Sequence, residues 1–172
     1  MITRHSKSFK AFLPLVAISI FLSFSCGNDV AYANIGFFNS SIAGTYVAND
    51  VDGGKIMQIS ADGNITLIFS DQFLGKGSLG ESYSNGLGSW KWVGLRKIVA
   101  QIVDVSYYSN NPGYFAGVGA YKAFIRFSRD LKTAYLTCDG GLFEPGVDPF
   151  APDAEPISTF DCGKVEYHRV RP

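Results

Sequence analysis

The sequence predicts an all-β fold, an antiparallel up-and-down barrel of about eight strands. Apolar and polar residues alternate with a period of two through most of the chain, and β-branched and aromatic residues are frequent in those segments. Short turns rich in Gly and Asp separate the segments, and none of them has a convincing helical period. A closed barrel is favoured over the alternative, a two-sheet sandwich, because closure leaves no exposed strand edge.

The first 33 residues have the pattern of a cleaved export signal. Basic residues within the first ten positions precede an uncharged apolar run at 11–24, which is shorter than a membrane span. Ala-Tyr-Ala at 31–33 then predicts cleavage before Asn34. The alternatives are an uncleaved anchor and a lipid anchor at Cys26, because residues 22–26 resemble a bacterial lipobox. We therefore expect a periplasmic or secreted protein, or one lipid-anchored to a bacterial membrane.

The rest of the chain, 34–172, has the size of one domain. Removing 33 residues from 172 leaves 139, enough for a single core. Of the 15 basic and 15 acidic residues, three basic and one acidic lie in the signal, which leaves 12 and 14. A net charge of about −2 argues against binding to nucleic acid or to an anionic lipid surface.

The first four strands are expected at 44–51, 54–60, 64–70 and 89–93. A single helical turn at 37–42 leads into them. The second and third strands form a hairpin, because Asp62-Gly63 supplies the positive-φ residues that a tight turn requires. In the third strand, three apolar side chains from Ile65 to Phe69 fall on one face. The fourth follows a long loop rich in Gly and Ser.

The last four strands are expected at 97–108, 120–128, 133–139 and 164–170. The first of these has apolar residues on both faces, so it is predicted to be buried on both sides or strongly curved. Turns at 94–96 and 129–132 connect these strands to their neighbours. In the strand at 120–128, alternate residues from Tyr121 to Phe127 share one apolar face.

The start of the first strand resembles the lipocalin opening. Gly44-Thr45-Tyr46 follows a short apolar lead-in, and lipocalins have a G-x-W motif that places an aromatic residue across the barrel floor. Tyr46 stands where that motif has Trp. Chain length and strand number are also similar to those of the lipocalin and fatty-acid-binding group. The resemblance implies a lipocalin-like, calycin-type barrel.

Aromatic residues on the strands are the candidates for ligand contact. An eight-stranded barrel has room either for its own side chains or for one small ligand. The candidate ligand-binding residues are Tyr46, Phe69, Trp90, Trp92, Tyr121 and Phe127. The alternative is that these aromatic residues fill the core. We expect a small apolar or amphipathic ligand.

Cys138 and Cys162 are expected to form a disulfide, because they are the pair that remains after Cys26 is removed or lipidated. The bridge closes a loop of about 25 residues and contributes ~3–4 kcal/mol in the chain-entropy model. Six acidic residues, four prolines and no basic residue lie between the two cysteines, at 139–161. Their spacing does not match a calcium-binding loop, and we expect a solvated acidic loop.

The two long loops, 71–88 and 139–161, support an alternative function as a surface or extracellular protein-interaction module. Gly75 to Gly80, "GKGSLG", has the glycine spacing of a dinucleotide-binding loop. No apolar helical period follows it, so we expect neither a nucleotide nor another cofactor.

Catalytic residues are hard to identify. His168 is the one histidine after residue 33, which excludes His-rich zinc sites, and no metal is expected. A third candidate function is a small barrel isomerase or cyclase that uses Asp104 or Glu166 with Arg126. The sequence favours a binding protein over an enzyme.

Overall fold

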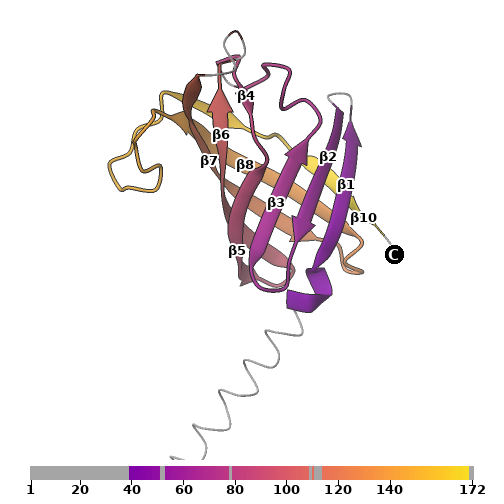
Figure 1. Ribbon diagram of the computed structural model, residues 1–172. Coiled ribbons are helices and arrows are strands. Elements are labelled where there is room, and N and C mark those ends of the chain that lie inside the picture. Colours follow the sequence, from indigo (N-terminus) through magenta and orange to yellow (C-terminus); the bar gives the residue numbers. More distant parts are fainter. Residues whose placement is uncertain (1–38, 51–52, 78, 109, 111–113, 171–172) are drawn as a thin grey trace, which may run out of the picture. The chain divides into compact units, whose positions relative to one another are not determined.

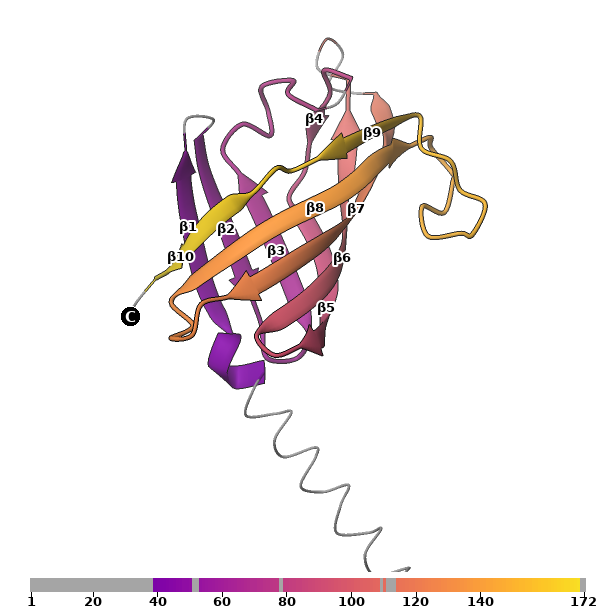
Figure 2. The ribbon, with the colours of Figure 1, turned by 180° about the vertical axis from the view of Figure 1, so that it is seen from behind.

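The computed structural model describes residues 39–50, 53–77, 79–108, 110 and 114–170. They form a closed antiparallel β-barrel with one helical turn at 39–42 (Figures 1 and 2). The predicted all-β barrel is therefore confirmed. The expected signal, its cleavage site after residue 33 and the alternative lipidation site at Cys26 lie outside the described residues.

Ten strands are present in the described residues, and eight of them close the barrel. They are β1 (Gly44–Asp50), β2 (Gly53–Ile59), β3 (Asn64–Phe69), β4 (Ser82–Tyr83), β5 (Gly86–Gly94), β6 (Lys97–Tyr107), β7 (Phe115–Phe127), β8 (Thr133–Phe143), β9 (Ser158–Asp161) and β10 (Val165–Arg169). The hydrogen-bonded order is β1-β2-β3-β5-β6-β7-β8, and β10 pairs with both β8 and β1 to complete the circle. All these pairings are antiparallel.

The two additional strands, β4 and β9, are short, and each shares one strand position of the barrel with another strand. β4 pairs with the end of β6, and β5 pairs with the rest of the same edge of β6. β9 and β10 likewise pair with the two halves of one edge of β8. The barrel therefore has eight strand positions, as predicted, and two of them are interrupted. The interruptions fall at 84–85 and 162–164.

Three strands are longer than predicted. β5 begins at Gly86, β7 begins at Phe115 and β8 continues to Phe143. Each added segment contains two glycines, and glycine disfavours strands because it has no side chain to pack. The connections are correspondingly shorter than the predicted loops at 71–88 and 139–161. They run from 70 to 81 and from 144 to 157.

The apolar core fills the end of the barrel where the helical turn lies. Its largest fully buried side chains are Tyr46, Tyr167, Phe127, Ile42, Met57, Ile59, Ile65, Leu67, Ile98, Ile102, Ile125 and Leu136. The Tyr46 hydroxyl donates to the Ile42 carbonyl at 2.9 Å. Arg169 donates to the Ser41 carbonyl at 2.8 Å and to the Ala43 carbonyl, and its guanidinium lies 5.8 Å from the centre of the Tyr46 ring. These contacts hold the helical turn to β1 and β10, so this end is the closed floor.

Cys138 and Cys162 form the predicted disulfide, with their Cα atoms 5.1 Å apart. Cys162 follows β9, and its backbone N–H donates to the Cys138 carbonyl at 3.1 Å. The bridge therefore fastens the interruption between β9 and β10 to the middle of β8.

Candidate functional site

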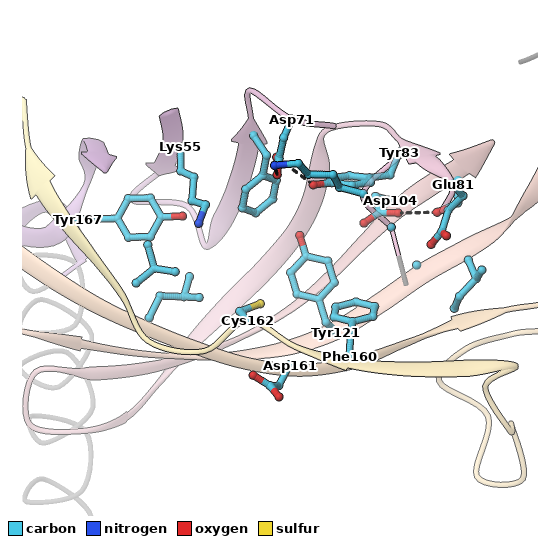
Figure 3. A pocket seen from close by; sticks show the side chains of 18 residues that line it. Lys55, Asp71, Glu81, Tyr83, Asp104, Tyr121, Phe160, Asp161, Cys162 and Tyr167 are labelled. Atoms are coloured by element: carbon cyan, nitrogen blue, oxygen red, sulfur yellow. Dashed lines mark hydrogen bonds and ion pairs between the residues drawn. The ribbon is translucent and has the colours of Figure 1, made fainter. Parts of the chain in front are cut away.

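A cavity of about 320 Å³ lies in the end of the barrel opposite the floor (Figure 3). Its walls come from β2, β3, β4, β6, β7, β8, β9 and β10, together with the connection that precedes β4. Apolar side chains and ionisable side chains both contribute. The apolar residues are Phe69, Leu136, Leu142, Phe160 and Val165.

Glycines at inward positions leave room for polar side chains in this part of the barrel. Gly119 on β7 pairs with Asp104 on β6, and a Cβ atom at Gly119 would meet the Asp104 carboxyl group. A Cβ atom at Gly86 on β5 would meet the Tyr121 hydroxyl. Near the floor, the inward positions of β5 and β7 carry Trp90 and Phe127 instead. The glycines therefore allow Asp104 and Tyr121 to lie inside the barrel.

Two carboxyl groups that point into the cavity, those of Asp104 and Glu81, have no cationic partner among the residues described, whereas Asp161 on the same wall is exposed and points away (Figure 3). Burial raises the pKa of Asp104 to about 6, the Ser106 hydroxyl and the Gly119 N–H lower it, and Glu81 raises it. Ser106 donates to Asp104 Oδ1 at 3.4 Å. Glu81 is buried whereas Asp104 is half-buried, and Glu81 Oε2 accepts from the Leu79 N–H at 2.7 Å.

A third carboxyl group at the open end, that of Asp71, has both a hydrogen-bond donor and a cationic partner. Tyr83 on β4 donates its hydroxyl hydrogen to Asp71 Oδ1 at 3.2 Å, and Lys76 Nζ lies 3.8 Å from Asp71 Oδ2. Burial and the Asp71 charge raise the pKa of Tyr83, so this phenol stays protonated and continues to donate. These contacts attach the connection at 70–81 to β4. Lys55 enters from β2 and lies beside Tyr167 (Figure 3).

The Tyr121 hydroxyl is a buried polar group on the cavity wall. The residue is 5% exposed, and its hydroxyl has no hydrogen-bond partner in the described structure. Burial raises the pKa of this phenol well above its ordinary value. The ring meets Phe160 edge-on with 5.9 Å between centroids, and the hydroxyl points into the cavity (Figure 3). Buried hydroxyls are almost always hydrogen-bonded, so this group has unused capacity.

Phe69 and Tyr121, two of the six predicted ligand-binding residues, line the cavity. The other four belong to or pack against the core cluster: Tyr46, Trp90, Trp92 and Phe127. The indole N–H groups of both tryptophans have partners, the Ser60 carbonyl at 3.1 Å and Asn39 Oδ1 at 2.7 Å. The structure thus separates the six aromatic residues into a floor group and a cavity group.

Sequence reasoning did not select Glu81, Tyr83 or Phe160 as site residues. Glu81 lies in a connection without periodicity, and Phe160 lies in the segment interpreted as an acidic loop. Asp104 had a usable signal, because alternation along β6 places it on the same face as Ile98 and Ile102.

The other predicted catalytic candidates lie outside the cavity. Glu166 is near His168, 3.6 Å between Oε1 and Nε2, and both side chains are largely exposed. Arg126 stacks over Tyr135, with 5.4 Å from Cζ to the ring centre. The structure therefore brings neither Glu166 nor Arg126 to Asp104.

Gly80 is followed by Glu81 and then β4, so the helix that a dinucleotide-binding loop requires does not follow "GKGSLG". Within the described ranges, no group of three or more His, Cys, Asp or Glu side chains is arranged to hold a metal ion. No helix in the described part of the chain has the length and apolar character needed to cross a membrane.

The connection at 144–157 projects from the barrel (Figures 1 and 2). It exposes Val147, Phe150 and Ile157, whereas Leu142 and Phe143 before it are buried in β8. The predicted alternative, a protein-interaction module, would use this connection together with the loop predicted at 71–88.

The lipocalin resemblance rests on Gly44-Thr45-Tyr46 and the closed eight-stranded barrel. Comparisons with protein-family models, curated proteins and solved structures find no match for the chain.

Proposed function

We propose that the protein binds one small amphipathic molecule inside the open end of a lipocalin-like barrel. The observation that carries this proposal is the cavity itself, about 320 Å³ in volume, with an apolar wall and a few polar groups that converge on it. Small-molecule sites have this composition and start at about 300 Å³. The Tyr121 hydroxyl supports the proposal, since a ligand would provide the hydrogen bond that no described residue provides.

The proposed compartment is the periplasm or the exterior of a cell. The Cys138–Cys162 disulfide is compatible with an oxidising environment. The export pattern in the first 33 residues points the same way, with lipid attachment at Cys26 as the alternative. In either case the barrel would meet ligands outside the cytoplasm.

The test is a cavity-filling substitution. Val165 lies on the cavity wall and is 7% exposed, so Val165→Trp places a large ring in the ligand volume. Val105→Trp is the matched control, because Val105 is 37% exposed and is not part of the cavity wall. Calorimetric titration with 2-phenylethanol should show binding to the wild type and to the control, and at least about tenfold weaker binding to Val165→Trp. Equal affinity in all three proteins would contradict the proposal, provided circular dichroism shows that all are folded.

A second candidate function is proton transfer on the bound molecule. It is favoured by the pKa of Asp104, about 6, which makes this carboxylate a competent base near neutral pH. The protonated Tyr121 phenol would act as the acid. Loss of turnover in Asp104→Asn while the neutral probe 2-phenylethanol still binds would distinguish an isomerase from a carrier.

A further inference from the structure

We infer that the cavity selects small molecules in which a cationic amine is joined to an apolar body, with the amine held between Glu81 and Asp104. This inference rests on the proposed function and specifies the chemical class of its ligand. It follows from the charges on the wall, from the unpartnered phenol and from the aromatic side chains around them.

The charges inside the cavity are not balanced. Lys76 is paired with Asp71, and Lys55 lies beside Tyr167, away from Glu81 and Asp104 (Figure 3). Glu81 and Asp104 have hydrogen bonds from a backbone N–H and a hydroxyl group, but no ion pair within the described residues. A buried carboxylate without a cation is costly, and a cationic ligand would offset that cost.

The unpartnered Tyr121 hydroxyl is a second and independent observation. Its oxygen faces the same part of the cavity as the Asp104 and Glu81 carboxyl groups (Figure 3). A primary ammonium group has three N–H donors and no acceptor. Two carboxylates and one phenol oxygen provide three acceptors, so one ammonium group could satisfy all of them. An anionic ligand would meet two like charges there.

Aromatic rings complete the amine site. Phe69 and Tyr83 form an edge-on pair with 6.1 Å between centroids, and Tyr121 and Phe160 form another at 5.9 Å. All four rings line the cavity. Aromatic faces attract cations, most strongly where water is excluded, and they also pack against an apolar body.

Three probes with the same ring and similar length test the inference: phenethylamine, 2-phenylethanol and 3-phenylpropanoate. Calorimetry at pH 7.5 should give an affinity for the amine at least about tenfold higher than for the alcohol, because charge-assisted hydrogen bonds are stronger than neutral ones. The propanoate should not bind measurably. Glu81→Gln and Asp104→Asn should each reduce the preference for the amine over the alcohol, since each keeps the shape and removes the charge.

Glu166→Gln is the matched control, because Glu166 is exposed and lies outside the cavity. It should leave the preference for the amine unchanged. Equal affinity for amine and alcohol, or a preference that survives both cavity substitutions, would overturn the inference and leave the proposed function standing. If none of the three probes binds, both proposals fail.

Discussion

The two ends of the barrel use the same strands for opposite purposes. At the floor, inward positions carry large side chains such as Trp90 and Phe127, and the Tyr46 hydroxyl donates to the Ile42 carbonyl. At the open end, inward positions carry glycine next to Asp104 and Tyr121, and among the described residues Asp104 has no cationic partner and the Tyr121 hydroxyl has no hydrogen-bond partner. Stability is concentrated where packing and hydrogen bonding are complete, and binding capacity is concentrated where they are not.

Truncation of one aromatic residue at each end should give the largest difference in the free energy of unfolding between the two regions. Phe127 is 2% exposed in the floor, and Phe127→Ala should lower the free energy of unfolding by about 3–5 kcal/mol. Phe69 is only partly buried beside the cavity, so Phe69→Ala should cost less, about 1–2 kcal/mol. Urea unfolding monitored by circular dichroism measures both changes. Equal losses would mean that the open end is packed as tightly as the floor.

The pH dependence of stability should depend on Asp104. Its folded pKa of about 6 is above the ordinary value of an aspartate, 3.8, so its carboxyl group contributes stability below about pH 4 that is lost as pH rises through 6. Asp104→Asn should therefore raise the free energy of unfolding at pH 8 by up to about 3 kcal/mol and leave it unchanged near pH 3.

Asp62 provides a control of opposite sign. Hydrogen bonds from Ser60 and Asn64 lower its pKa, so its carboxylate contributes stability at pH 8 that is lost as pH falls through the folded pKa. Asp62→Asn should thus destabilise the protein at pH 8. Urea unfolding at pH 3 and 8 compares the two variants, and an Asp104→Asn variant that is not stabilised at pH 8 would contradict the raised pKa of Asp104.

The smallest expected difference concerns two single hydroxyl groups. Tyr46→Phe leaves the Ile42 carbonyl without its side-chain donor and should cost about 1 kcal/mol. Tyr121→Phe removes a hydroxyl that has no partner in the described residues, so the free energy of unfolding should stay the same or rise slightly. A loss of stability in Tyr121→Phe as large as that in Tyr46→Phe, measured by thermal unfolding, would show that the phenol has a structural role.

The period-two pattern was sufficient to predict the eight strand positions. The closed barrel followed from the cost of exposed strand edges, and the disulfide partners followed from the number of cysteines. The pattern failed at the strand ends where glycines cluster, as in the first residues of β5 and β7, because glycine lacks the side chain on which strand propensity depends. Two of those glycines, Gly86 and Gly119, leave room for Tyr121 and Asp104 in the cavity. The sequence does not show this role of the glycines, because it depends on the register that pairs Gly119 on β7 with Asp104 on β6.

The candidate site was predictable to the extent that its residues lie in regular strands. Phe69 and Tyr121 follow from alternation, and Asp104 falls on the inward face of β6 by the same rule. Glu81 reaches the cavity from an irregular connection, so no periodicity could indicate it. Whether an aromatic residue lies in the floor or in the cavity depends on its position along the barrel axis. Alternation indicates only which face of the strand a side chain occupies.

The most direct measurement is a ¹H–¹⁵N NMR titration of residues 34–172 with phenethylamine at pH 7.5. The account predicts saturable shift changes at backbone amides of the open end, including Asp104, Tyr121 and Phe160, with little change at the floor around Tyr46 and Trp90. Shift changes confined to the connection at 144–157, or spread over the outer surface, would contradict a ligand site inside the barrel.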